Sequence, residues 1–161
     1  MEKHPQEIGQ IRYGADVINR IIESAKPGGR RRLQKAVIDE TINPLIQQMC
    51  RAAKFPNKQI YRMCVAGNTT MNHLFAGVNA DPVRMEPYIP TFYKTNSLYA
   101  SDLGLTVNPD AHIIIAPNIG SYVAEISLPV HWSACCGINR NFLCLSTLEP
   151  MVSWYLVTLI L

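Results

Sequence analysis

Two short apolar runs, each ending at a turn, constrain the fold of this chain more than any other feature of its sequence. The first run covers 59–66 and is followed at once by Gly67, Asn68, Thr69 and Thr70. The apolar residues beyond this turn recur at helical spacing. The pattern therefore predicts a buried strand, a tight turn and a helix in direct succession.

The second run, at 112–116, has three isoleucines at its centre and also ends in a turn, formed by Asn118, Ile119, Gly120 and Ser121. Strands that alternate with helices predict an α/β layer fold. In such folds ligands bind where strand ends meet helix starts. We therefore expect a shared crevice between the two turns.

Helical periodicity dominates the rest of the chain before the first strand. An apolar stripe over 13–26 predicts one helix, and a second pattern over 30–49 predicts another. Pro44 removes a backbone donor from the second helix, so we expect a kink or a division there. Further along, the three prolines of 81–91 predict an extended connection, and 97–103 predicts a short helix.

The turn at 67–70 is the strongest local candidate for ligand binding. Glycine allows close approach of the backbone, and the helix that follows offers free N–H groups and its positive dipole end to a phosphate or carboxylate. Asn68, Thr69 or Thr70 equally fits a helix cap that satisfies the same N–H groups. The residues alone leave both interpretations open, and the turn at 118–121 poses the same choice.

Charge and cysteine content bound the classes of partner. The 161 residues include 15 basic and 12 acidic ones, and the formal net charge of +3 is too small to predict binding to nucleic acid or to a membrane. The dense cluster Arg30–Arg32 is typical of a solvated helix face, with a phosphate patch as the alternative. No signal peptide and no CxxC pair are present, so we expect a reduced, cytoplasmic setting and no metal or iron–sulfur site in this stretch.

Five segments together carry a family resemblance. In chain order they read QIRYGADVINRI, CVAGNTTMNHLF, DPVRMEPYIP, SDLGL and HIIIAPNIGSYV. Over 10–123 the chain resembles the ATPase domain of reductive activators of corrinoid proteins. Each segment alone is a weak signal, but the ordered set is specific.

This resemblance implies an α/β fold of the actin-like, ribonuclease H-like (ASKHA) class, of which the chain would hold one incomplete lobe. It implies ATP and Mg as cofactors, used to drive reduction of the cobalt in a corrinoid methyltransferase partner, and a 2Fe–2S cluster in a ferredoxin-type module that this chain lacks. The first phosphate loop of the family would precede residue 13. The site residues that the resemblance implies lie where the first lobe ends and the second begins, with no catalytic base among them: Gly67, Asn68, Thr69, Thr70, Asn118, Gly120 and Ser121.

The similarity to the family ends abruptly after Val123. A shifted reading frame can be tested on the residues themselves. Each new codon takes the third base of one residue's codon and the first two bases of the next. From Ala124 onward, such codons can spell GDITAG and later DFGTNGE. These are the family motifs missing from the chain, including its second phosphate loop. Two junctions allow no freedom: Met151–Val152 forces a glycine codon and Trp154–Tyr155 forces a valine codon. We therefore expect a partial ATPase-like domain over 1–123 and a frameshifted, non-native tail over 124–161.

The residues and the resemblance leave three function classes. The first, which the resemblance implies, is a fragment of an ATP-dependent activator of corrinoid-dependent methyltransferases that is inactive alone. The alternative is a small nucleotide- or partner-binding module without catalysis. A third is a small membrane-associated protein that uses the C-terminal apolar run. A tail without selected periodicity is expected to attach loosely, and its apolar run at 151–161 is shorter than the roughly 20 residues of a membrane span.

Overall fold

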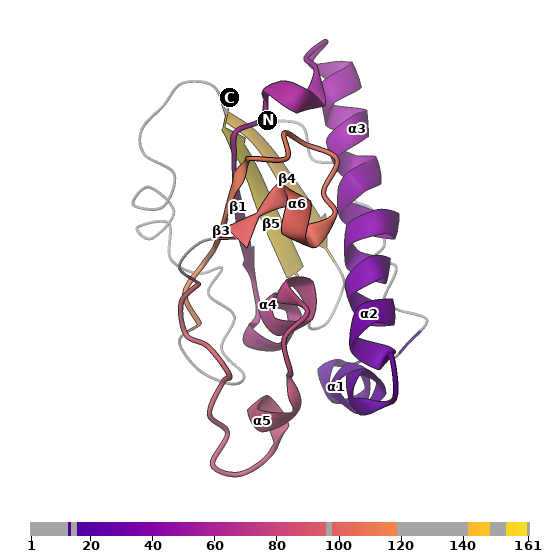
Figure 1. Ribbon diagram of the computed structural model, residues 1–161, viewed down its shortest axis with the longest axis vertical. Helices are drawn as coiled ribbons and strands as arrows, with labels where there is room; N and C mark the ends of the chain where they lie inside the picture. Colours follow the sequence, from indigo (N-terminus) through magenta and orange to yellow (C-terminus); the bar gives the residue numbers. More distant parts are fainter. Residues whose placement is uncertain (1–12, 14–15, 96–97, 119–141, 149–153, 161) are drawn as a thin grey trace.

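The computed structural model describes residues 13, 16–95, 98–118, 142–148 and 154–160. It has a mixed α/β architecture in which helices pack against a twisted sheet of strand order β2-β3-β1-β5-β4 (Figure 1). The α/β prediction is confirmed. The assignment to the ASKHA class stays a prediction.

The first helix, α1 (Val17–Ala25), starts later than the apolar stripe predicts. Asp16 is its N-cap, and the Asp16 carboxylate accepts a hydrogen bond of 2.7 Å from the backbone N–H of Asn19. A cap of this kind satisfies donors that have no intrahelical partner. The helix therefore begins where its side-chain acceptor lies.

The second helical pattern folds into three consecutive segments that form a long column beside the sheet (Figure 1). They are α2 (Gly29–Val37), the π-helical segment η2 (Ile38–Ile42) and α3 (Asn43–Ala52). Pro44 lies in the first turn of α3, where its missing N–H is tolerated. The predicted division takes the form of π pairing over Ile38–Ile42, and α pairing resumes at Asn43, one residue before the proline.

The predicted strands are both present and pair in parallel. The short η3 (Asn57–Gln59) precedes β1 (Arg62–Gly67), which pairs with β3 (His112–Ile115) through Met63↔Ile113 and Val65↔Ile115. These four residues are buried together in the hydrophobic core. The crossover between the two strands carries α4 (Thr69–Ala76), which covers the sheet.

The crossover beyond α4 differs in part from the sequence prediction. The expected extended connection begins with a short helix, α5 (Asp81–Arg84), because Pro82 falls in its first turn. The expected helix at 97–103 is shorter, as α6 (Ala100–Leu103). It is preceded by the two-residue strand β2 (Leu98–Tyr99), which pairs antiparallel with β3 and is too short to show any alternation.

Two further strands extend the sheet beyond β1. They are β4 (Phe142–Leu148) and β5 (Trp154–Ile160), and β5 runs antiparallel to β1 over the whole of that strand. The expectation of a loosely attached tail is wrong for these two segments. Backbone N–H and C=O groups at the β1 edge can pair with any extended segment, so pairing does not require a selected side-chain pattern.

Two side-chain contacts hold the helical column to the crossover. The side-chain amide of Asn43 bonds to the loop after α6 as a backbone peptide group would. Its Nδ2 donates to Gly104 O (3.1 Å), and its Oδ1 accepts from Thr106 N (2.9 Å). Gln34 donates to Phe75 O (3.1 Å) at the end of α4. The Gln34 contact holds the end of α4, the helix whose first turn carries the predicted site.

Candidate functional site

The turn between β1 and α4 is closed by its own cap. Asn68 is the N-cap of α4, and its side-chain oxygen accepts from Met71 N at 2.8 Å. Its backbone carbonyl accepts from Asn72 N at 2.9 Å. The turn residues are buried, with Asn68 at 7% and both Thr69 and Thr70 at 1% exposure. The helix-cap interpretation of this turn is therefore the one that the geometry favours.

The end of β3 lies against the same helix. Asn118 is 4% exposed, and its side-chain oxygen accepts from Asn72 Nδ2 at 2.8 Å. Asn72 Nδ2 also donates to Gly67 O at 3.3 Å. One asparagine of α4 therefore joins the last residue of β1 to the segment that follows β3. Gly120 and Ser121, the other predicted residues of the second turn, lie outside the described residues.

His73 belongs to the same buried network. Its Nδ1 donates to Thr69 O (2.6 Å), and its Nε2 accepts from Thr91 N (3.0 Å). The ring stacks on Phe92 with the two ring centroids 4.5 Å apart. Desolvation by burial lowers the pKa of His73, although the hydrogen bond to Thr69 opposes this shift. The imidazole is thus neutral with both nitrogens engaged, and it is not free to act as a base.

The segment 91–93 is held by contacts with α4 and with Asn118. Thr91 and Phe92 contact His73, while Asn118 Nδ2 donates to Phe92 O (3.0 Å) and Asn118 N donates to Tyr93 O (2.8 Å). We call Asn68, Asn72, His73 and Asn118 the amide cluster. It holds two strand ends and one connecting segment in a fixed arrangement.

Two atoms near the amide cluster lack partners. The hydroxyl of Thr70 and the side-chain oxygen of Asn72 are buried without a hydrogen bond. Such atoms normally have a protein or water partner, because burying an unpaired polar group is costly. Among the described residues, these two side-chain atoms keep hydrogen-bonding capacity for another group.

The sequence predicted part of this arrangement. Gly67, Asn68 and Asn118 do lie close together, as expected for the carboxyl ends of neighbouring parallel strands. Asn72 was not among the predicted site residues, although its position four residues after Asn68 places both on one helix face. His73 was not among the predicted site residues either, and its contacts show a structural role.

Two surface hollows lie away from the amide cluster. One, of about 280 Å³, lies between α2 and α6. The other, of about 390 Å³, lies at the end of α3. The predicted site residues that the structure describes line neither hollow. The arginines of α2 are exposed, and Arg32 pairs with Glu23 at 3.2 Å, as expected for a solvated helix face.

The structure offers no metal site within its described residues, where no group of three or more His, Cys, Asp or Glu side chains converges. Cys50 and Cys64 are both buried, and neither forms a disulfide among the described residues. In the described part of the chain, no helix has the length and apolar character needed to cross a membrane.

Comparison with known proteins shows three similarities. Residues 2–125 match the family model described as the RACo middle region. The chain is 31% identical over 124 residues to the corrinoid activation enzyme RamQ of Eubacterium limosum, a match that covers 76% of this chain and 21% of the relative. It also resembles the solved structure of a reductive activator for corrinoid, iron-sulfur protein, with TM-score 0.70 and 39% identity over 74% of this chain and 19% of that one.

Proposed function

This chain belongs to the RACo middle-region family, and we propose that it is a piece of an ATP-dependent reductive activator of corrinoid-dependent methyltransferases, without turnover of its own. The chain spans about a fifth of the relatives it matches. In this proposal the complete activator uses ATP to help an iron–sulfur donor pass an electron to the cobalt of a corrinoid protein. The present chain contributes a structural part of one ASKHA lobe.

The observation that carries this proposal is the hydrogen bond between Asn72 and Asn118. It joins the carboxyl ends of two parallel strands, which is the edge where α/β folds bind ligands. All of the described members of the predicted site lie at this edge. A rigid edge of this kind is what a nucleotide-binding lobe requires as a support for its phosphate loops.

The residues present do not form a complete nucleotide site. The first turn of α4 has Met71 N satisfied by Asn68, and its side chains are almost fully buried, so the turn is not an open phosphate cradle. The described residues likewise hold no carboxylate cluster for Mg and no cysteine cluster for iron and sulfur. In our proposal the phosphate loops and the 2Fe–2S cluster belong to other parts of the activator.

We further propose that the stretch from 124 onward is read in a shifted frame. The family match ends at residue 125, close to the point where the shifted reading begins to spell the family motifs. Sequencing the DNA across codons 120–130 tests this idea directly. A single missing or extra base is expected there, and an intact frame in independent genomic DNA would remove the proposal.

A frame-restored protein tests the function itself. The shifted frame is corrected and the chain is extended to the length of its relatives. We expect this protein to bind ATP and to support reduction of a corrinoid protein, which is measured by the absorbance change of the corrinoid. The 161-residue chain is expected to hydrolyse no ATP. Hydrolysis by the 161-residue chain at the rate of the restored protein would contradict the proposed role.

The alternative function is a binding module that holds a nucleotide without catalysis. The unpartnered oxygens of Thr70 and Asn72 favour it, because they could accept or donate hydrogen bonds to a bound group. Calorimetric titration of the 161-residue chain with ATP and with adenosine separates the two functions. Saturable binding that Thr70→Val abolishes would support the module, and absence of binding supports the fragment.

A further inference from the structure

The end of the molecule opposite the amide cluster is basic and hollowed. The stretch 41–80 contains no Asp or Glu, yet it carries four cations. These are Arg51, Lys54, Lys58 and Arg62, and all four are exposed. They lie in the last turn of α3, just after that helix, in η3 and at the start of β1, and these elements meet at one end of the molecule (Figure 1).

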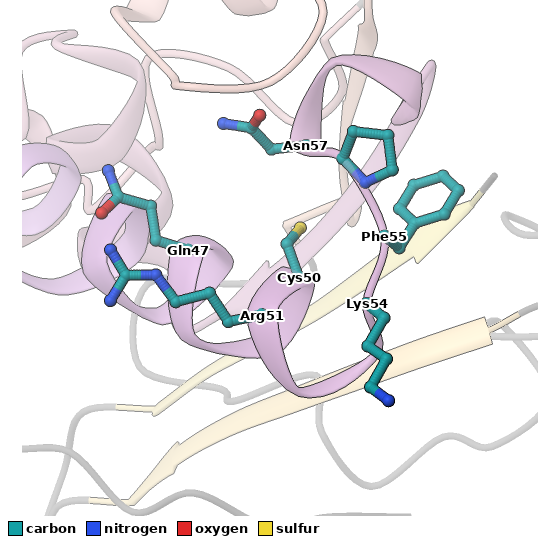
Figure 2. Close-up of a pocket in the computed structure, with 7 residues that line it drawn as sticks. Gln47, Cys50, Arg51, Lys54, Phe55 and Asn57 are labelled. Carbon is teal, nitrogen blue, oxygen red and sulfur yellow. The ribbon is translucent and has the colours of Figure 1, made fainter.

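A hollow of about 390 Å³ opens at this end. Figure 2 shows Gln47, Cys50 and Arg51 projecting from α3 along one side, with Phe55 and Asn57 on the other. Lys54 and Pro56 complete the lining. The lining thus combines apolar groups, two amides and two cations, and the Asn57 amide also donates to the carbonyl of Thr106.

The cations here have few competing partners. In the described residues no ion pair involves Arg51, Lys54 or Arg62, and the Lys58 ammonium donates only to the carbonyl of Val107 at 3.3 Å. The carbonyls that end α3 are satisfied by backbone amides, such as Phe55 N donating to Cys50 O at 2.8 Å. The cations are therefore not needed as helix caps.

Favourable interaction with the negative end of the α3 dipole accounts for cations at 51 and 54. It does not account for Lys58 and Arg62, which follow in η3 and β1. Four exposed cations without acidic neighbours in sequence repel each other, which costs stability unless a partner of opposite charge binds. The surface is thus complementary to an anionic partner.

We propose that this basic hollow is a docking site for an acidic segment of a partner protein, with an apolar side chain of the segment in the hollow and its carboxylates against Arg51 and Lys54. The Asn57 amide already donates to the carbonyl of Thr106, so the Gln47 amide is the one that suits the peptide backbone of such a segment. The hollow is large enough for one aromatic side chain but holds no row of stacking aromatics, which favours a peptide over a single-stranded nucleic acid. This inference does not depend on the proposed nucleotide function.

Binding of a labelled peptide to the 161-residue chain tests the docking site. The probe is a short capped peptide in which glutamates flank one phenylalanine, and its fluorescence anisotropy is followed at low and at high salt. We expect saturable binding that weakens with salt, because exposed charge pairs are screened. The double variant Arg51→Glu with Lys54→Glu is expected to weaken binding by about tenfold or more.

The matched control is Arg30→Glu with Arg31→Glu, which makes the same change of charge on the exposed face of α2. It is expected to leave peptide binding within about twofold of the original. Equal losses in both double variants would show attraction by net charge alone and would overturn the proposal. So would absence of saturable binding, or tighter binding of an oligothymidylate of the same charge.

Discussion

The two ends of the parallel strand pair use polar residues in opposite ways. At the carboxyl end, Asn68, Asn72, His73 and Asn118 are buried and bonded to one another or to backbone. At the amino end, Arg51 and Lys54 are exposed at the margin of a hollow. The first group is committed to holding the fold, while the second is available to a partner. Substitutions at the two ends should therefore affect different properties.

The largest effect is expected from His73→Ala. The change removes two hydrogen bonds and the stacking on Phe92 and leaves a cavity in a fully buried position. We expect the free energy of unfolding to fall by about 3 kcal/mol. Urea denaturation followed by circular dichroism measures it. A loss below about 1 kcal/mol would mean that the carboxyl end is less rigid than its contacts indicate.

The bond between Asn72 and Asn118 is the next largest contribution. Asn72→Ala removes the donor to Gly67 O and to Asn118, and Asn118→Ala removes the acceptor for Asn72. We expect each single variant to lower the free energy of unfolding by about 2 kcal/mol. A double-mutant cycle should give a coupling of about 1 kcal/mol between the two positions. Additive losses would show that the two strand ends are not connected through this pair.

The stability contributed by the carboxyl end of the strands should depend on pH through His73. Burial lowers the pKa of His73 in the folded state, so the unfolded state binds a proton more readily. The stability contributed by the neutral ring is complete above about pH 6.5 and is lost as pH falls from there through the lower folded pKa. Thermal melts across this pH range should show a loss of stability as the pH falls. This loss should be smaller than the loss that His73→Ala causes at neutral pH, and it should be absent in His73→Gln.

The smallest effect on stability is expected at the amino end. Arg51→Glu with Lys54→Glu should change the free energy of unfolding by no more than about 0.5 kcal/mol, since both side chains are exposed. The same urea titration checks this value beside the loss of peptide binding. A large destabilisation would remove the contrast between the two ends.

Local patterns predicted the elements well and their connections less well. The helices and the two parallel strands follow from periodicity, and the division at Pro44 follows from the missing N–H. The strand β2 and the short helix α5 were missed, because two residues show no alternation and a proline is tolerated in a first helical turn. The pairing of β5 with β1 depends on an unfilled backbone edge, which no side-chain pattern records.

The sequence by itself determined the α/β class, the family, and the two turns at the strand ends, because these depend on residues close together in the chain. Tertiary structure decided what the turn residues do. It brought Asn118 to Asn72 across 46 positions and engaged both ring nitrogens of His73. Hydrogen bonds between distant segments depend on how helices and strands pack, and packing sums many weak contacts that no local motif specifies.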